Sequence, residues 1–324
     1  MVCEALKEGM DMSSNLLSNT RLLTRLVWFA LLGVFGTALL FTGFYYIDRY
    51  FHLDDFSPLE MRNTDLEAQV RQNPNNLETR LALAEQYLRS HNDAAAIDQA
   101  QQVISSDPEN DRALFVLGMA HSNTGETEAG VHYLEQFVDL HQEESSAPSD
   151  MALQTGLYYL GVNYLNIGRS EDAITVLSQA LSINSTDADA LYQLGLAYLR
   201  TGQYQVALEN FKKAVLFVPD YLEAYKGMED CYTALQQPDY ALVAQGMQAF
   251  SLKEYEKASQ LLGEAVDKLP NEAQVYLGLG LAREQLGDLV AAQEYLKMTL
   301  ALDANNFTAS NALERLQTAM NQGE

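Results

Sequence analysis

Hydrophobic residues recur along most of the chain at spacings of three and four positions, which is typical of amphipathic helices. The stretch LYQLGLAYLRTGQYQVALENFKKAVLFVPD, residues 191–220, contains two such runs, separated by Gly202 and followed by Pro219. A glycine with positive φ commonly ends a helix, and a helix usually ends before a proline. The pattern therefore predicts two short antiparallel helices joined by a tight turn.

The same pattern returns with a period of about 34 residues, a length typical of repeat architectures. A glycine inside a helix costs about 1 kcal/mol relative to alanine, so its recurrence indicates a packing requirement. We expect each such glycine to let a small residue of the second helix approach closely, Ala173 or Ala207 in these two stretches. The recurring positions are Gly161, Tyr164, Gly168, Ala173, Leu177 and Ala180 in one stretch, and Gly195, Tyr198, Gly202, Ala207, Phe211 and Ala214 in the next.

This period and pattern resemble the tetratricopeptide repeat (TPR), over about residues 75–305. The resemblance implies a right-handed α-solenoid of helix pairs. With the flanking segments, the expected fold class is all-α: about six helix-pair repeats, one extra helix and a C-terminal capping helix, preceded by one transmembrane helix.

The expected layout has one irregularity, because the step from Gly195 to Gly246 is one and a half periods. We interpret the surplus as an extra helix that bends or offsets the array; alternatively, 238–250 is its second helix and the later frame is irregular. The predicted segments are a polar arm at 1–25, a transmembrane helix at 26–47, a joint and pre-repeat helix at 48–76, units one to four at 77–221 with a loop inserted at 142–150, the extra helix at 222–238, the last two units at 239–306, and a capping helix and tail at 307–324.

The segment Leu26–Ile47 is apolar and contains no charged residue. As a helix it would span about 33 Å, close to the hydrocarbon thickness of a bilayer. A polar arm precedes it and no A-x-A pattern follows, which favours an uncleaved membrane anchor over a signal peptide. Arg21 and Arg25 precede the span and Arg49 follows it. The positive-inside rule then predicts a single-pass protein with a cytoplasmic N-terminus and an extracytoplasmic array.

The composition and the absence of known motifs disfavour several classes of function. The chain has 44 acidic and 20 basic residues, a formal net charge of −24, which disfavours nucleic acid and anionic lipid headgroups as partners. No histidine pair has the spacing of a helical metal site, and neither a phosphate-binding loop nor a nucleophile with a matching base is present. We expect no enzyme activity, no metal, no cofactor, no nucleic acid and no small-molecule substrate.

The TPR resemblance implies that the first helix of each unit lines a concave groove. In unit one the matching positions include Glu85, Leu88 and Arg89, and the lysine and asparagine clamp of chaperone-binding members is absent. Units two to four offer an apolar, aromatic stripe suited to a segment of another protein; alternatively, its residues pack between adjacent first helices. The predicted groove residues are Phe115, Met119, Tyr158, Val162, Leu165, Asn166, Tyr192, Leu196, Leu199 and Arg200.

These features predict a non-enzymatic, membrane-anchored interaction scaffold that holds or assembles a membrane or extracytoplasmic protein complex. Two alternatives stay open. The anchor followed by the stretch 64–88 also resembles TPR subunits of bacterial cytochrome c maturation, which present apocytochrome. The third is a permanent structural subunit of a large membrane complex.

Overall fold

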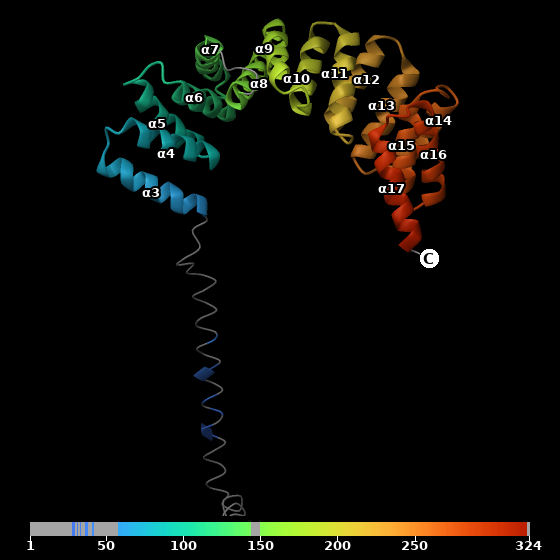
Figure 1. Ribbon diagram of the computed structural model, residues 1–324, viewed down its shortest axis with the longest axis horizontal. Coiled ribbons are helices and arrows are strands. Elements are labelled where there is room, and N and C mark those ends of the chain that lie inside the picture. The colour runs from blue at the N-terminus through green and yellow to red at the C-terminus, as the bar shows by residue number, and fades with distance from the viewer. Residues whose placement is uncertain are drawn as a thin grey trace, which may run out of the picture. The chain divides into compact units, whose positions relative to one another are not determined.

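The computed structural model describes residues 58–143 and 150–322, and seven scattered residues between Trp28 and Phe41. The chain forms two compact units, residues 1–61 and 62–324. Within 58–143 and 150–322 every regular element is an α-helix (Figure 1). The helices are α3 (Pro58–Gln72), α4 (Leu77–Arg89), α5 (Asp93–Ile104), α6 (Asp111–Thr124), α7 (Thr127–Glu143), α8 (Met151–Asn166), α9 (Ser170–Ile183), α10 (Ala188–Arg200), α11 (Tyr204–Phe217), α12 (Leu222–Ala234), α13 (Pro238–Ser251), α14 (Tyr255–Val266), α15 (Ala273–Gln285), α16 (Leu289–Leu302) and α17 (Phe307–Gln322).

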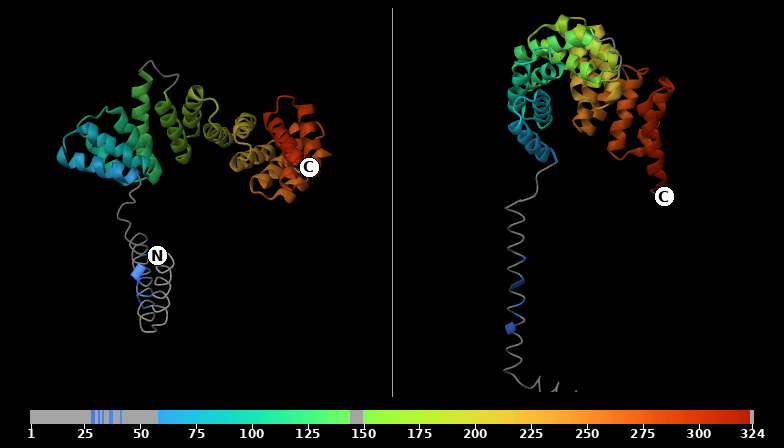
Figure 2. Two further views of the ribbon diagram at one scale, coloured as in Figure 1. Left: turned by 60° about the horizontal axis from the view of Figure 1, so that its bottom comes forward. Right: turned by 60° about the vertical axis from the view of Figure 1, so that its left-hand side comes forward.

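Successive helices stack side by side, and from α4 to α11 they form regular pairs of a first and a second helix (Figures 1 and 2). From α4 onward each helix contacts the next one, and the first helices α4, α6, α8, α10 and α12 also contact one another in series. Each pair therefore buries its apolar face against its neighbours, as a solenoid requires. The all-α solenoid predicted from the sequence period is confirmed.

The recurring glycines lie where a large side chain of the second helix meets the first helix. A Cβ added at Gly161 would lie 2.5 Å from Cγ of Leu177, and one at Gly195 would lie 2.6 Å from Cε1 of Phe211. The expectation that an alanine of the second helix approaches the glycine was wrong. The nearest side chain belongs to a bulky residue on the second helix, which fills the space that the missing Cβ leaves.

The turn between first and second helix has a residue with positive φ throughout the described array. Gly168, Gly202 and Gly287 have φ values of +79°, +76° and +79°, as the glycine turn predicted at Gly202 requires. In three turns the residue is not glycine: His91, Gln236 and Lys253, with φ values of +56°, +58° and +62°. Gln236 joins α12 to α13 and Lys253 joins α13 to α14, so helix α13 follows one such turn and precedes another.

Helix α13 consequently has two roles. It is the second helix of α12, and it is also the first helix of α14, because Gly246 lies against Leu262 of α14 as Gly195 lies against Phe211. It also contacts α15, as first helices do along the array. The two sequence interpretations gave residues 238–250 different roles, either the first helix of the next unit after an extra helix at 222–238 or the second helix of that extra helix. Helix α13 combines both roles.

The contact between α12 and α13 is largely apolar, but it is polar at the positions where the preceding pair places a glycine against a buried ring. One period after Gly195 and Phe211, the corresponding positions hold Glu229 and Gln245. The Glu229 carboxylate accepts hydrogen bonds from Nε2 of Gln245 and of Gln248, each at 2.6 Å. We call Glu229, Gln245 and Gln248 the polar seam. In the preceding pair a glycine lies against a buried ring. Between α12 and α13, a hydrogen-bonded carboxylate takes the place of that glycine.

A single helix covers the C-terminal end of the array, and another is hydrogen-bonded to its N-terminal end. Helix α17 buries Leu313 and Leu316 against Leu277 and Leu281 of α15, which are 7% and 6% exposed. At the other end, the Tyr87 hydroxyl of α4 donates a hydrogen bond of 2.7 Å to Glu67 of α3. Capping by a helix with a polar outer face is what an otherwise open stack needs for solubility.

Several predicted segments lie outside the described residues: the arm at 1–25, the joint from 48 to 57, the loop residues 144–149 and most of the span Leu26–Ile47. The described residues of that span, Trp28 among them, are helical. Within the part of the chain that the structure describes, no helix combines the length and apolarity needed to cross a membrane.

Candidate partner-binding groove

The predicted groove residues lie on α6, α8 and α10, and they differ in exposure. Met119 and Leu165 are buried, at 9% and 3%, so they belong to the core between helices. Asn166 and Arg200 are exposed at the ends of their helices. Six residues remain half-buried and can reach a partner: Phe115, Tyr158, Val162, Tyr192, Leu196 and Leu199.

Two of these residues join a third tyrosine in a cluster. The Tyr192 ring lies 5.2 Å from the Tyr221 ring, between centroids, and the Tyr221 hydroxyl donates a hydrogen bond of 2.7 Å to Oδ1 of Asp189. Tyr158, on α8, lies close enough for Asp189 to influence its ionisation. We call Tyr158, Tyr192 and Tyr221 the tyrosine cluster. It brings together α8, α10 and the turn before α12.

Sequence reasoning missed Tyr221, because it precedes the first helix of its unit. A signal was available. Tyr221 stands at the N-cap of α12, one period after Asp187, whose carboxylate caps α10 by accepting from the backbone N–H groups of Asp189 and Ala190. Tyrosine makes no such cap here. A departure from the usual capping residues therefore marks a position with another role.

The tyrosine cluster has a negative electrostatic environment. Burial, followed by the carboxylates of Asp189 and Asp187, raises the pKa of Tyr158 to about 12. Burial and then Glu223 raise the pKa of Tyr192, and burial with the hydrogen bond to Asp189 raises the pKa of Tyr221. All three hydroxyls consequently stay protonated at neutral pH.

Arg200 has a structural partner. Its guanidinium donates a hydrogen bond to the backbone carbonyl of Leu165 in the last turn of α8. Helix C-terminal carbonyls lack partners within the helix and favour a cation. Arg200 thus joins α10 to the end of α8, and this use of its guanidinium could not be read from the groove position alone.

An open pocket of about 310 Å³ lies at the N-terminal part of the groove. Only Phe115 among its lining residues was in the predicted set, although Glu85, Leu88 and Arg89 occupy the matching positions of unit one. The Arg112 guanidinium crosses its rim, donating hydrogen bonds to Glu85 at 2.8 Å and to Glu78 at 3.0 Å. The residues that line the pocket are Glu85, Leu88, Arg89, Asp111, Arg112, Phe115, Val116, Phe137, His141 and Ala152.

His141 is a pocket residue that the sequence did not indicate, because it lies on the second helix α7. Its Nε2 lies 3.8 Å from Oδ2 of Asp111 and 3.6 Å from Oδ2 of Asp150, and its ring centroid is 4.3 Å from that of Phe137. The histidine therefore lies between the N-termini of α6 and α8. It closes one wall of the pocket.

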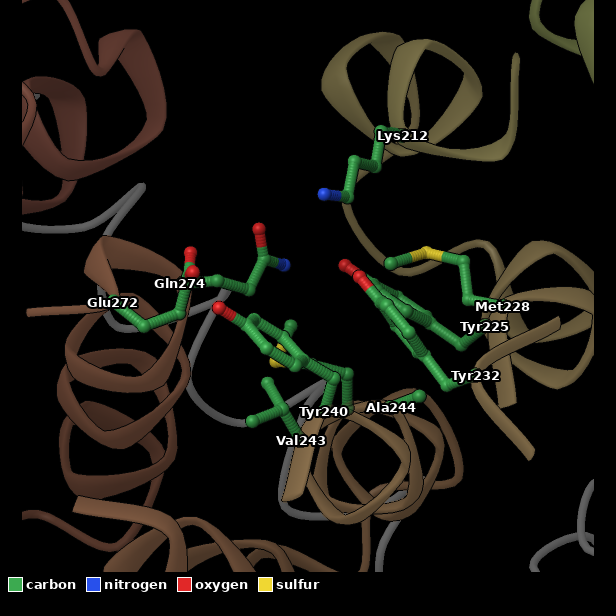
Figure 3. Close-up of a pocket in the computed structure, with 10 residues that line it drawn as sticks. Lys212, Tyr225, Met228, Tyr232, Tyr240, Val243, Ala244, Glu272 and Gln274 are labelled. Carbon is green, nitrogen blue, oxygen red and sulfur yellow. The ribbon is translucent and has the colours of Figure 1, made fainter. Parts of the chain in front are cut away.

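A smaller cavity of about 30 Å³ lies where α11, α12, α13 and α15 meet (Figure 3). The rings of Tyr232 and Tyr240 stack at 5.3 Å, and Nζ of Lys212 lies 6.0 Å from the Tyr232 centroid. Figure 3 shows the Lys212 ammonium and the Gln274 amide directed toward the same space as the hydroxyls of Tyr225 and Tyr232. The cavity has room for about two water molecules, too little for a ligand.

Groups that could support chemistry are sparse among the described residues. No cluster of His, Cys, Asp or Glu within 58–143 and 150–322 has the geometry of a metal site. Cys231 is fully buried in α12, and burial, followed by Asp230, raises the pKa of its thiol to about 12. A buried, protonated thiol is unreactive.

Stacked helix pairs with a half-exposed aromatic inner face define a helical-repeat binding module. Sequence models described as TPR repeat and tetratricopeptide repeat match residues 161–202, 188–221, 81–145 and 243–307, together more than half of the chain. The chain belongs to the TPR family, whose members mediate protein–protein interactions. Residues 222–242, which none of these models matches, contain α12 and the start of the two-role helix α13.

Curated relatives share part of the repeat array. RNA polymerase II-associated protein 3 of Xenopus tropicalis is 32% identical over 123 residues, 38% of this chain and 16% of that protein. Heat shock protein STI1 of Saccharomyces cerevisiae is 31% identical over 134 residues, 41% of this chain and 20% of that protein. The matched stretch thus spans a fifth or less of these two proteins.

Solved structures are similar in fold. The crystal structure of MamA is 24% identical, with a TM-score of 0.47, covering 54% of this chain and 97% of MamA. A tetratricopeptide repeat protein from Parabacteroides merdae is 16% identical, with a TM-score of 0.45, covering 87% of this chain and 98% of that protein. These similarities concern the helical architecture and add nothing on function.

Proposed function

We propose that this protein is a non-enzymatic, membrane-anchored scaffold that binds a segment of a partner protein in its groove and so holds or assembles a protein complex. The observation that carries the proposal is the open pocket of about 310 Å³ on the groove positions of α4 and α6. Its lining combines the rings of Phe115 and Phe137 with the charged side chains of Arg89 and Glu85. Such a site suits a peptide side chain with an apolar stem.

The groove extends from the pocket along the next first helices. Tyr158 and Val162 on α8, and Tyr192 and Leu196 on α10, stay half-buried after the helices have packed. Aromatic residues that retain exposure supply large contact areas at small entropic cost. A partner segment lying in the pocket would therefore meet a second set of contacts on α8 and α10.

The membrane part of the proposal is supported by the segment Leu26–Ile47, which is apolar and carries no charge. Its described residues Trp28, Phe29 and Phe41 expose 63%, 73% and 75% of their surface. Large apolar side chains on all sides of a helix suit a lipid environment. With two arginines before the span and Arg49 after it, we place the N-terminus in the cytoplasm and the array outside it.

The test is quantitative affinity purification of the full chain in mild detergent, comparing the wild type with the double variant Tyr158→Ala/Tyr192→Ala. The matched control is Phe307→Ala, which removes a side chain that is 72% exposed at the start of α17, away from the groove. We expect a specific partner with the wild type and the control, and its loss with the double variant. Retention of the partner by the double variant would contradict groove binding.

The same purification separates the kinds of scaffold. A permanent structural subunit keeps a fixed ratio to its partners after extraction, whereas an assembly factor is substoichiometric. The cytochrome c alternative has its own readout, because deletion of the gene should then abolish haem staining of c-type cytochromes. Normal haem staining in the deletion strain removes that alternative.

A further inference from the structure

The tyrosine cluster lies on the groove side of α8 and α10 and presents three half-buried phenol rings. Tyr192 and Tyr221 lie 5.2 Å apart, between centroids, and Tyr221 and Asp189 are held together by a hydrogen bond of 2.7 Å. The hydrogen bond fixes the Tyr221 ring beside Tyr192. The rings therefore form a preorganised aromatic surface, and the faces of aromatic rings carry partial negative charge.

Carboxylates dominate the charges around these rings. Asp189 and Glu223 are exposed beside the cluster, while Asp187 is occupied by the α10 cap and by a hydrogen bond of 2.7 Å from Gln154. The nearby cation is Arg200, whose guanidinium is bound to the carbonyl of Leu165. The raised pKa values of the tyrosines agree with this negative environment.

We infer that the tyrosine cluster binds a positively charged side chain, arginine or lysine, of the partner segment, with Asp189 and Glu223 as its counter-ions. The inference rests on the proposed function and adds the chemistry of the partner. A guanidinium stacked on the rings gains cation–π attraction, and its N–H groups can reach a carboxylate at the same time. The net charge of −24 adds a long-range attraction for basic segments.

The test uses the full chain in zwitterionic detergent and short fluorescent peptides that share their apolar positions but carry Arg, Gln or Glu at the polar positions. Binding is measured by fluorescence anisotropy at low and high salt. We expect the Arg peptide to bind most tightly and to weaken as salt rises, because charge attraction is screened. The Glu peptide should bind least.

Variants assign the binding to the cluster. Asp189→Asn or Glu223→Gln should weaken the Arg peptide by about two- to fivefold, the range for a solvent-exposed ion pair. Tyr192→Ala should weaken it by about two- to thirtyfold, the range for a cation–π contact. The control Glu171→Gln removes an exposed carboxylate of the second helix α9 and should leave the affinity unchanged. Asp189 also holds the Tyr221 hydroxyl, so Glu223→Gln serves as the second variant if Asp189→Asn perturbs folding.

Each outcome decides the question. Equal binding of the Arg and Glu peptides, equal effects of Asp189→Asn and Glu171→Gln, or no binding of the Arg peptide overturns the inference. If the partner captured from cells still depends on Tyr158 and Tyr192 in those cases, the groove function stands and only the cationic chemistry is wrong. Loss of that dependence removes the proposed function itself.

Discussion

At the scale of single residues, the recurring glycines are explained by the side chains that face them. Phe211 is fully buried, and its ring lies between Gly195 of α10 and Gly227 of α12, where added Cβ atoms would lie 2.6 Å and 2.5 Å from ring carbons. The ring cannot move away from one glycine without approaching the other. The same ring thus holds two successive units together.

Changing Gly195 to Ala should therefore destabilise the array. Overpacking a rigid ring costs about 1–3 kcal/mol, which exceeds the gain of about 1 kcal/mol in helix propensity. Gly263, on the exposed face of α14, is the matched control, because an added Cβ there meets no atom within 4 Å. We expect a lower melting temperature for Gly195→Ala and a slightly higher one for Gly263→Ala. Shifts of the same sign in both variants would contradict the packing explanation.

A second prediction at this scale concerns alkaline pH. The pKa of Tyr158 is raised in the folded state to about 12, from an ordinary value of 10.0, mainly by burial. The stabilisation from keeping this hydroxyl neutral is fully present below pH 10 and is lost as the pH rises toward 12. The melting temperature should fall over this range, and less so for Tyr158→Phe, which has no ionisable hydroxyl. An identical pH profile for both proteins would refute the assignment.

The sequence predicts the role of a residue where that role recurs with the repeat period. The glycine turns and the buried alanines recur with the period, so they could be recognised without a structure. Tyr221 and His141 do not recur in this way. Tyr221 lies in a turn between units and is marked only by its departure from the usual capping residues, and His141 lies on a second helix. Their proximity to the groove comes from the stacking of neighbouring units, which no single repeat encodes. Stacking also buries Met119 and Leu165, which fits the alternative that such residues pack between adjacent first helices.

At the scale of elements, α13 is the feature that the repeat pattern leaves ambiguous. Residues 238–251 fit both a second helix after α12 and a first helix before α14, and both descriptions apply. The positive-φ turns at both ends of α13 give the helix its two roles, but nothing in the sequence indicates a positive φ at Gln236 or Lys253. Glycine normally provides that signal, because other residues adopt the conformation at a cost.

The polar seam should be the least stable contact between neighbouring helices of this region. Glu229→Ala removes the acceptor of two hydrogen bonds, each worth about 1.5–3 kcal/mol when one partner is charged and less where solvent competes. We expect faster amide hydrogen exchange in α12 and α13, with α8 and α9 unchanged. Gln245→Ala, which removes one of the two bonds, should have a smaller effect. Exchange accelerated uniformly along the array would argue against a local seam.

At the scale of the whole molecule, the first-helix row that lines the groove runs from α4 to α12, where α13 packs as a second helix. The helices α13, α15 and α17 form their own contact series. A partner segment that follows the first row therefore meets the pocket on α4 and α6 and the tyrosine cluster beside α12. Both candidate contact sites belong to the same row, so a segment that follows this row would engage both.

The side of the membrane on which this row is presented can be tested with one thiol. Ser310 is exposed on α17, and Cys231 is fully buried with a raised pKa, so a Ser310→Cys variant that also carries Cys3→Ser has one reactive thiol. If the array is extracytoplasmic, as the arginines around Leu26–Ile47 favour, a membrane-impermeant maleimide should label this variant in intact cells. The Cys3→Ser protein alone is the background control. Labelling that appears only after the cells are permeabilised would place the array, and with it the groove and its partner, in the cytoplasm.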